Sequence, residues 1–348
     1  MTALAVGVVG AGWMATDYHV PAFSDHPRTT VVGFAERDDD RRDAVAAETG
    51  LPGYADASAL VRAHDLDVVS ICTPPSTHEP IFLEAVDHGC HVLCEKPLAT
   101  TVASARRMAD AAAEAGVVTQ VGYLHRYYEN YRRALRLLDE HLLGDIVEVT
   151  VAHHSTPPTQ RWYYDPTLSG GGVARDLLPH SLDVLFEVFG GDPTVTDASV
   201  RHLRDRAVED AARVSLDFDG VPVTLSTTWT QTEGVSRFMV VGTEGWLELD
   251  AERLEGDVYG RPFAFEGGRL PIVDLGIADL FPASDEDAHT ARIHDFADRA
   301  AADDPDTAAP ASRGVAVAEV IDTAYEMAGA DWNGDESDTD GPSAEGRQ

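Results

Sequence analysis

Cysteine is scarce in this sequence, and long apolar runs are missing. The 348 residues include three cysteines, Cys72, Cys90 and Cys94. Such an odd and sparse set suits a reducing compartment better than a disulfide framework. No stretch reaches the roughly 18 apolar residues of a membrane span, and the apolar start from Ala3 to Val9 has no basic leader. We therefore expect a soluble, unprocessed protein of the cytoplasm.

Positive charge is scarce as well. Sixty acidic residues stand against 26 basic ones, which gives a formal net charge of -34. A surface of this charge repels nucleic acid and anionic membranes, so we expect neither as a partner. The acidity is spread along the chain, as in proteins of halophiles that accumulate salt. It predicts a halophilic source and says little about function.

Lysine is almost absent. The sequence has 25 arginines and a single lysine, Lys96. Arginine stays protonated at any working pH, whereas burial and neighbouring charges can tune a lysine to give or accept a proton. The exception therefore favours a chemical role for Lys96, although one lysine could also survive by chance.

The length and the hydrophobic content of 44% predict two packed domains. The apolar run Leu4–Val9 leads into a glycine-rich turn and a helix expected to reach Pro21. A second run, Thr30–Ala35, precedes a charged helical segment and completes a βαβ unit. Further strands, each after a segment of helical composition, are expected at 68–73, 91–94 and 117–121. Residues 1–122 should form a dinucleotide-binding Rossmann domain of the α/β class with a parallel sheet.

Beyond residue 122 the pattern changes to strands with short connections. The expected strands are 146–154, 211–218, 221–230, 237–241 and 246–249. Helices are expected from Val173, at 287–302 and at 312–328. This order predicts an α+β substrate and oligomerisation domain over 123–330 with a mostly antiparallel sheet. Residues 331–348 are acidic and offer almost nothing to bury, so we expect a disordered tail.

The glycine-rich turn has the pattern of a dinucleotide site. In Gly10-x-Gly12-x-x-Ala15, Gly10 permits the tight turn and Gly12 lets the backbone approach a pyrophosphate at a helix N-terminus. Trp13 and Met14 lie inside the same turn. An ordinary glycine-rich turn is the alternative, but the position directly after a first strand favours the cofactor.

Glu36 ends the second predicted strand, where an acid hydrogen-bonds the ribose hydroxyls of NAD. Arg37 follows at once, with Arg41 and Arg42 nearby, and these could instead bind the 2′-phosphate of NADP. The arginines could equally form a solvated helix face. We expect NAD as the cofactor and leave NADP open.

Two further segments follow predicted strands at the edge where ligands bind in parallel sheets. The first contains Thr73, Pro74 and His78, in a loop that prolines stiffen; His78 could instead cap the next helix. The second is Glu95-Lys96-Pro97. This position places the single lysine beside the expected nicotinamide.

A glycine run, 170–172, opens a helix that carries Asp176 and His180. Residues four apart share a helix face, so a carboxylate and an imidazole project together. Histidine can accept a hydroxyl proton as hydride leaves carbon, and the carboxylate can orient the imidazole or the substrate. Asp176 and His180 are therefore catalytic candidates with Lys96.

These motifs together resemble the Gfo/Idh/MocA oxidoreductases, across both domains. The resemblance implies a Rossmann domain joined to a large, open-faced and mostly antiparallel sheet. It implies an NAD(P)-dependent dehydrogenase acting on CH–OH groups of a sugar, inositol or related polyol, and a homo-dimer or homo-tetramer. It further implies that Lys96, Asp176 and His180 surround the nicotinamide, with His180 as the base and Lys96 as its electrostatic partner. Ala15 in place of the third glycine, and Glu36 where many relatives have Asp, depart from the family pattern.

Four residues are weaker candidates for contacts with the substrate. Tyr123 and Arg126 resemble the family's crossover into the second domain, although core packing explains the tyrosine equally well. Arg161 and Trp162 lie in a loop before the glycine run, and an aromatic face can stack on the C–H surface of a sugar. We expect no metal at the Cys90-His91-x-x-Cys94 segment, because cysteines in buried strands behave as small hydrophobic residues.

Two other functions are compatible with these motifs. Some members of the superfamily are glycosidases that use bound NAD in a redox-elimination cycle without net NADH production. A non-catalytic nicotinamide sensor would bind the cofactor without reducing it, and the three catalytic candidates disfavour it. The identity of the sugar or polyol depends on loops that composition does not decode.

Overall fold

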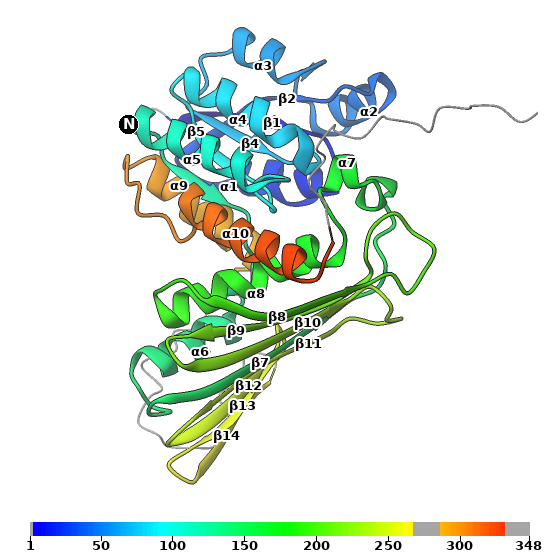
Figure 1. The fold of residues 1–348 in the computed structure, drawn as a ribbon. Coiled ribbons are helices and arrows are strands. Elements are labelled where there is room, and N and C mark those ends of the chain that lie inside the picture. Colours follow the sequence, from blue (N-terminus) through cyan, green and yellow to red (C-terminus); the bar gives the residue numbers. More distant parts are fainter. Residues whose placement is uncertain (1–2, 267–285, 331–348) are drawn as a thin grey trace, which may run out of the picture.

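The computed structural model describes residues 3–266 and 286–330, which form two sheets joined through helices (Figure 1). The six-stranded sheet packs hydrophobic clusters on both faces. The eight-stranded sheet carries α6 and α8 on the side toward the first sheet, and no helix of the described residues covers its other face in Figure 1. The expected fold, a parallel Rossmann sheet plus a large and mostly antiparallel sheet, is confirmed.

The first sheet has the strand order β3-β2-β1-β4-β5-β6, with every pairing parallel. Its strands are β1 (Leu4–Val9), β2 (Thr29–Ala35), β3 (Gly53–Tyr54), β4 (Val68–Ile71), β5 (His91–Cys94) and β6 (Thr119–Val121). Its helices are η1 (Ala15–His19), α1 (Val20–Asp25), α2 (Asp39–Thr49), α3 (Ala57–Ala63), η2 (Pro75–Thr77), α4 (His78–Asp87) and α5 (Val102–Ala115). The strand order reverses between β1 and β4, and the crevice at such a point is where dinucleotides bind.

The second sheet has the order β14-β13-β12-β11-β7-β10-β9-β8, in which β7 and β10 form the parallel pair. Its strands are β7 (Ile146–His154), β8 (Thr194–Arg201), β9 (Ala211–Phe218), β10 (Val221–Thr228), β11 (Val235–Gly242), β12 (Gly245–Leu249), β13 (Arg253–Val258) and β14 (Arg261–Glu266). The remaining helices are η3 (His125–Tyr127), α6 (Glu129–Asp139), η4 (Arg161–Tyr164), α7 (Pro166–Ser169), α8 (Val173–Phe189), α9 (Ala288–Ala300) and α10 (Ala311–Met327).

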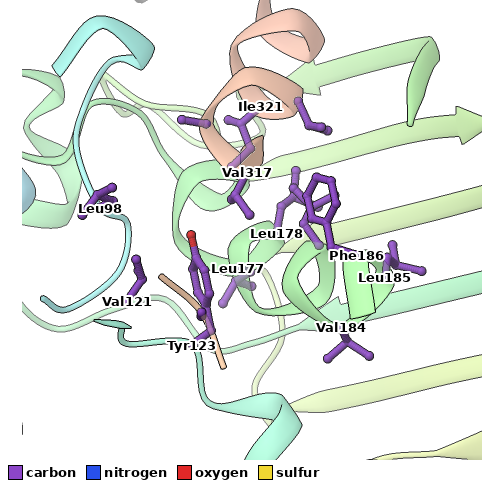
Figure 2. Close-up of a cluster of buried hydrophobic side chains, with 14 of the residues drawn as sticks. Leu98, Val121, Tyr123, Leu177, Leu178, Val184, Leu185, Phe186, Val317 and Ile321 are labelled. Atoms are coloured by element: carbon purple, nitrogen blue, oxygen red, sulfur yellow. The ribbon is translucent and has the colours of Figure 1, made fainter. Parts of the chain in front are cut away.

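Helices α8 and α10 connect the two halves of the molecule. Leu177 and Leu178 of α8 lie beside Val317 and Ile321 of α10, and Leu98 from the first half belongs to the same buried cluster (Figure 2). Burying a leucine of this kind contributes about 1.5–3 kcal/mol. One continuous core therefore fixes α8, which carries the catalytic candidates, against the nucleotide-binding sheet.

Helix α9 packs against the first sheet, although it follows the second sheet in sequence. Ile293 and Phe296 of α9 are fully buried and share a cluster with Val6, Val8 and Phe23. The domain boundary at residue 122 stays a prediction. Helix α9, which belongs to the predicted second domain, completes the hydrophobic core of the first sheet.

Some expected elements differ from the structure. The first helix continues past Pro21 to Asp25, because the π-helical turn η1 passes directly into α1 and Pro21 follows that wider turn. Strands β3, β8, β13 and β14 are additional; β8 alternates exposed and half-buried residues and so lacks an apolar run. The predicted tail at 331–348 lies outside the described residues. Among those residues, no helix combines the length and the apolar character needed to cross a membrane.

Candidate active site

The glycine turn lies at one end of a cleft of about 1000 Å³. The cleft runs along the carboxyl ends of β1, β2, β4 and β5 and reaches the loops of the second half. Of the predicted cofactor residues, those that line it are Gly10, Gly12, Trp13, Met14, Glu36, Arg37, Thr73, Pro74, Glu95 and Lys96. The structure therefore brings together most of the residues that the sequence singled out.

The two glycines of the turn have different structural requirements. Gly10 has a φ of +90°, and a Cβ there would lie 2.9 Å from the carbonyl carbon and oxygen of Cys72. Gly12 has no such neighbour, since a Cβ would meet nothing within 4 Å. The open space beside Gly12 fits the close approach of a dinucleotide pyrophosphate to the backbone.

Glu36 is fixed at the end of β2 by two backbone amides. Its Oε2 accepts from Ala11 N–H and its Oε1 from Asp38 N–H, both at 3.1 Å. Arg41 Nε donates to Ala11 O at 2.6 Å and lines the cleft with Arg37. A carboxylate and two guanidinium groups thus lie where the adenosine ribose of a bound dinucleotide would be.

His78 does not line the cleft, contrary to prediction. Its ring is fully buried, with Nδ1 3.1 Å from Pro97 O and Nε2 2.8 Å from Thr73 O. Burial lowers its pKa. His78 ties the Thr73 loop to the turn that follows Lys96, so it supports two cofactor-facing segments without facing the cofactor itself.

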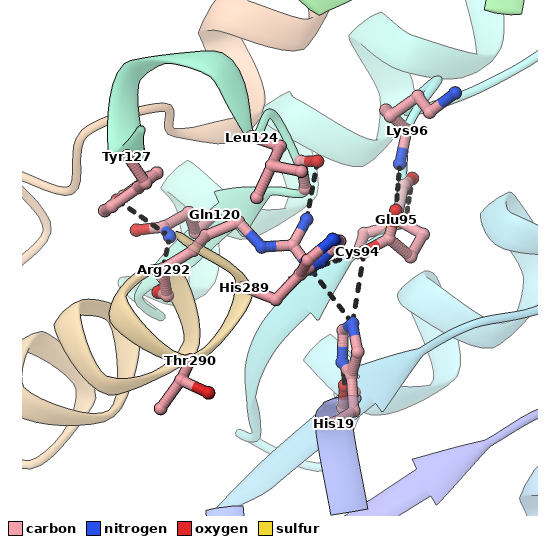
Figure 3. Close-up of polar contacts among 12 residues, drawn as sticks. His19, Cys94, Glu95, Lys96, Gln120, Leu124, Tyr127, His289, Thr290 and Arg292 are labelled. Carbon is pink, nitrogen blue, oxygen red and sulfur yellow. Dashed lines mark hydrogen bonds and ion pairs between the residues drawn. The ribbon is translucent and has the colours of Figure 1, made fainter. Parts of the chain in front are cut away.

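Glu95 lies at the base of the cleft in a buried polar network (Figure 3). Its Oε1 accepts from Arg292 Nη2 at 2.7 Å and lies 3.1 Å from His19 Nε2. His19 Nδ1 lies 2.7 Å from Ser70 Oγ, and Arg292 Nη1 donates to Gly122 O at 2.5 Å. Burial would raise the pKa of Glu95, but the Arg292 charge and the His19 hydrogen bond outweigh it and hold the pKa well below its usual range. The ionised Glu95 fixes the turn that carries Lys96.

Lys96 and Asp176 form an ion pair across the two halves of the molecule. Lys96 Nζ donates to Asp176 Oδ1 at 2.5 Å and to Asp176 O at 2.9 Å. The other carboxylate oxygen of Asp176 accepts from Trp229 Nε1 at 3.2 Å. Both side chains are mostly buried, so water screens the pair weakly and its geometry is well defined.

His180 lines the cleft one helical turn after Asp176. Its Nδ1 accepts a hydrogen bond from Leu124 N–H at 3.2 Å. The ring stacks on His125, with 4.9 Å between ring centroids and 19° between planes. Burial and the nearby Lys96 charge lower the pKa of His180 well below 6.5. The imidazole is therefore held neutral in a fixed orientation.

Aromatic side chains of the loop before the glycine run also line the cleft. Trp162 stacks on Tyr163 at 3.8 Å between centroids, and Tyr163 packs edge-on against Trp229. Trp162, Tyr163 and Gln160 line the cleft, whereas the predicted substrate residue Arg161 does not. Two aromatic rings thus line the same cleft as Lys96 and His180.

Tyr123 and Arg126 also lie away from the cleft, so their predicted contact with substrate is corrected. Tyr123 is 1% exposed and belongs to the core. Arg126 is buried, where Nε and Nη2 donate to the two carboxylate oxygens of Asp183 at 2.7 and 2.8 Å. Because this buried bidentate ion pair already provides hydrogen-bond acceptors for the guanidinium group, Arg126 does not require a substrate group as a partner.

Comparison with known proteins identifies the family. Residues 4–123 match the description "Oxidoreductase family, NAD-binding Rossmann fold", and residues 131–248 match "GFO/IDH/MocA C-terminal domain". The 1,5-anhydro-D-fructose reductase of Ensifer adhaerens is 32% identical over 251 residues, which cover 69% of this chain and 74% of that protein. The chain belongs to the Gfo/Idh/MocA family of oxidoreductases. Membership confirms the expected oxidoreductase class and NAD as the cofactor.

Two other proteins show how far the likeness extends. A dTDP-3,4-didehydro-2,6-dideoxy-alpha-D-glucose 3-reductase of Streptomyces violaceoruber is 28% identical over 85% of both chains. The structure of a levoglucosan dehydrogenase in complex with NADH and levoglucosan has a TM-score of 0.81 at 21% identity. It covers 94% of this chain and 98% of that one. The latter likeness shows that the two proteins share one fold over nearly the whole chain.

Four residues of this Gfo/Idh/MocA site were not predicted: His19, Glu209, Trp229 and Arg292. Glu209 is fully buried and accepts from Gly172 N–H and Ala174 N–H, both at 2.9 Å, so it caps the N-terminus of α8. A Cβ on Gly172 would lie 2.0 Å from Glu209 O. The glycine run is therefore needed for this close approach, which sets the position of Asp176 and His180.

The described residues hold no group of three or more His, Cys, Asp or Glu side chains arranged to bind a metal ion. Cys72, Cys90 and Cys94 have free thiols, and burial raises the pKa of Cys90 to about 11. These thiols are accordingly protonated and poor metal ligands.

Proposed function

We propose that this protein transfers a hydride between a CH–OH group of a sugar, inositol or related polyol and NAD. The observation that carries the proposal is that Lys96 and His180 line the same cleft as the glycine turn, with Asp176 paired to Lys96. The carbohydrate class is supported by the names of the relatives, an anhydrofructose reductase, a deoxysugar reductase and a levoglucosan dehydrogenase. The aromatic rings of Trp162 and Tyr163 suit the C–H face of a sugar ring.

The residues at the cleft would have different roles in the reaction. Bound NAD would supply a two-electron acceptor at its nicotinamide ring. Lys96 and His180 would hold the substrate oxygen from two sides, and Asp176 would orient Lys96 through their ion pair. The glycine turn, Thr73 and Pro74 would position the dinucleotide, with Glu36 at its ribose hydroxyls. Arg37 and Arg41 also line the cleft and could pair with a 2′-phosphate, so we further propose that the protein can use NADP.

The test is a panel of aldoses, inositols and sugar acids with NAD or NADP, followed by the absorbance of the reduced nicotinamide. We expect reduction with at least one member, and a loss of about 10²–10⁴-fold in kcat for Lys96→Ala. Arg106→Met, which breaks an exposed ion pair with Glu319, serves as the matched control. Binding of NAD without reduction across the panel would contradict the proposal. Glycoside cleavage without net NADH would instead indicate the redox-elimination cycle.

Three broader expectations stay predictions: a halophilic source, a cytoplasmic location and a homo-oligomer. The net charge of -34 supports the first, because salt screens the repulsion between acidic residues. We expect activity and thermal stability to rise with KCl concentration, and an optimum in dilute buffer would contradict this. Sedimentation at the same salt concentrations gives the oligomeric state.

A further inference from the structure

The contacts of His180 fix which of its ring nitrogens carries the proton. Leu124 N–H donates to Nδ1 at 3.2 Å, so Nδ1 presents a lone pair. A neutral imidazole has one N–H and one lone pair, so the proton of His180 lies on Nε2. The ring cannot turn without losing this hydrogen bond and its stack on His125. His180 therefore faces the cleft as a hydrogen-bond donor.

Protonation of His180 is opposed from every side. A proton on Nδ1 would point at Leu124 N–H, so two donors would face each other. The charged and titratable groups around the ring are Lys96 after β5, His125 before α6, His153 on β7 and Arg292 on α9. All of them disfavour a positive charge on the His180 ring. Asp176, the nearby carboxylate, is engaged by Lys96 and Trp229. His180 is thus neither a ready proton acceptor nor a ready proton donor to the substrate.

Lys96, unlike His180, has a proton that it can transfer to the substrate. An ammonium group has three N–H donors. Two of them go to Asp176 Oδ1 and Asp176 O, at 2.5 and 2.9 Å. The third is left for a group in the cleft, which Lys96 lines together with His180. The chain otherwise uses arginine, which does not exchange protons, so the single lysine stands where proton exchange is needed.

Resting on the function proposed above, we propose that Lys96 exchanges the proton with the substrate oxygen, while His180 serves only as a neutral Nε2–H donor to that oxygen. This reverses the roles that the sequence predicted for the two residues.

The step balances in both directions. In reduction, a hydride from the reduced nicotinamide forms the new C–H bond, an Nζ–H bond of Lys96 breaks, and that proton forms the O–H bond of the alcohol. Lys96 is left as an amine and regains its proton from solvent. In oxidation the alcohol O–H breaks toward the Lys96 amine, the carbon-bound hydrogen leaves with its electron pair to NAD, and a ketone or lactone forms. His180 keeps the same proton throughout.

The first test reads the tautomer directly and needs no substrate. The full chain is labelled with 15N-histidine, and long-range 1H–15N correlations are recorded near neutral pH. The signal of His180 is assigned by its loss in His180→Gln. We expect a protonated Nε2 and an unprotonated Nδ1. A proton on Nδ1, or on both nitrogens, would overturn the inference even if the protein proves to be the proposed dehydrogenase.

The second test separates the two roles by activity. In His180→Gln an amide N–H remains near the position of Nε2 but cannot exchange a proton, so we expect kcat to fall by only about tenfold. His180→Leu has no donor and should lose about 10²–10³-fold. Equal losses of more than about 10³-fold in both variants would assign the proton to His180.

Lysine variants supply the complementary result. Lys96→Arg keeps the charge but cannot exchange a proton, so we expect a loss of about 10³-fold, close to that of Lys96→Ala. Added methylamine should restore activity to Lys96→Ala in proportion to its concentration and leave the parent protein unchanged. The pH dependence of kcat should persist in His180→Gln and disappear in the lysine variants. Near-normal activity of Lys96→Arg, or rescue of His180→Leu by imidazole, would overturn the inference.

Discussion

Arg292 offers a sharp test of how the base of the cleft is held together. Its guanidinium reaches from α9 into the first half of the molecule, where Nη2 donates to Glu95 Oε1 and Nη1 to Gly122 O. Arg292 is 1% exposed and Glu95 is 9% exposed. Arg292→Met keeps most of the apolar stem and removes the charge. The substitution leaves a buried carboxylate without its counter-charge.

The expected cost follows from that unpaired carboxylate. Removing one partner of a buried ion pair costs about 3–5 kcal/mol, because the remaining charge stays desolvated. Burial is the largest cause that lowers the pKa of His19 and it remains in the variant, so it opposes transfer of the counter-charge to His19. A domain has a total stability of about 5–15 kcal/mol, so the loss is a large fraction of it. Arg106→Met, in the exposed pair with Glu319, should cost less than about 1 kcal/mol.

The pH dependence has a definite sign. In the parent protein the folded-state pKa of Glu95 lies below its usual value of 4.5. Its contribution to stability is therefore present above pH 4.5 and is lost as the pH falls through the folded value. In Arg292→Met, burial still raises the pKa of Glu95 but the Arg292 charge no longer lowers it, so we expect a folded pKa higher than in the parent. The deficit of the variant relative to the parent is largest near neutral pH and shrinks as the pH falls.

Urea unfolding of the parent, of Arg292→Met and of Glu95→Gln/Arg292→Met measures these differences. The double variant should recover part of the lost stability, because it removes the unpaired charge. A loss below about 1 kcal/mol in Arg292→Met, or a deficit that grows toward acid pH, would refute the reasoning. A double variant no more stable than Arg292→Met would do the same.

Three further outcomes test the cleft. Gly12→Ala should be as stable as the parent, because a Cβ there meets nothing within 4 Å. Its affinity for NAD, measured by titration calorimetry, should fall by at least about tenfold. Gly10→Ala should lower the stability itself, because residue 10 has a φ of +90°. Glu36→Ala should weaken NAD and shift the ratio of kcat/KM toward NADP by about tenfold, and an unchanged ratio would remove Glu36 from cofactor choice. Burial lowers the pKa of His153 from 6.5 to about 4. As the pH falls from 6.5 to 4, the free energy of unfolding of the parent should therefore decrease by up to about 3 kcal/mol relative to that of His153→Phe. Unfolding curves that stay parallel across that range would contradict it.

The sequence predicted the parts of the site that depend on local order. Gly10 and Gly12 follow a strand directly, and Lys96 follows another, so the topology of a parallel sheet brings them to one edge. Asp176 and His180 are four apart on one helix, which is enough to place them on a common face. In the first case the order of strands along the chain, and in the second the spacing of two residues on one helix, was enough to predict the placement.

The residues that were missed or given the wrong role depend on contacts between distant segments. Arg126 pairs with Asp183, 57 positions away, and this pairing decides that it serves the core and not the substrate. Glu209 caps α8 from a loop 35 positions beyond Ala174. Arg292 gave a signal of its own, because it precedes Phe296 by four positions and so lies on the apolar face of α9. A charged residue on such a face indicates a buried partner, but the partner's identity required the fold.

The crossover segment after β6 explains how Lys96 and His180 are placed together. Gly122 O holds Arg292, which holds Glu95, the residue next to Lys96. Two positions on, Leu124 N–H holds His180. A Cβ on residue 122 would lie 2.5 Å from Arg292 Nη1 and 2.8 Å from Glu95 Oε1, so glycine is required there. One short segment thus sets the position of Lys96 and the tautomer of His180 at once, which ties the two halves of the catalytic site to a single piece of backbone.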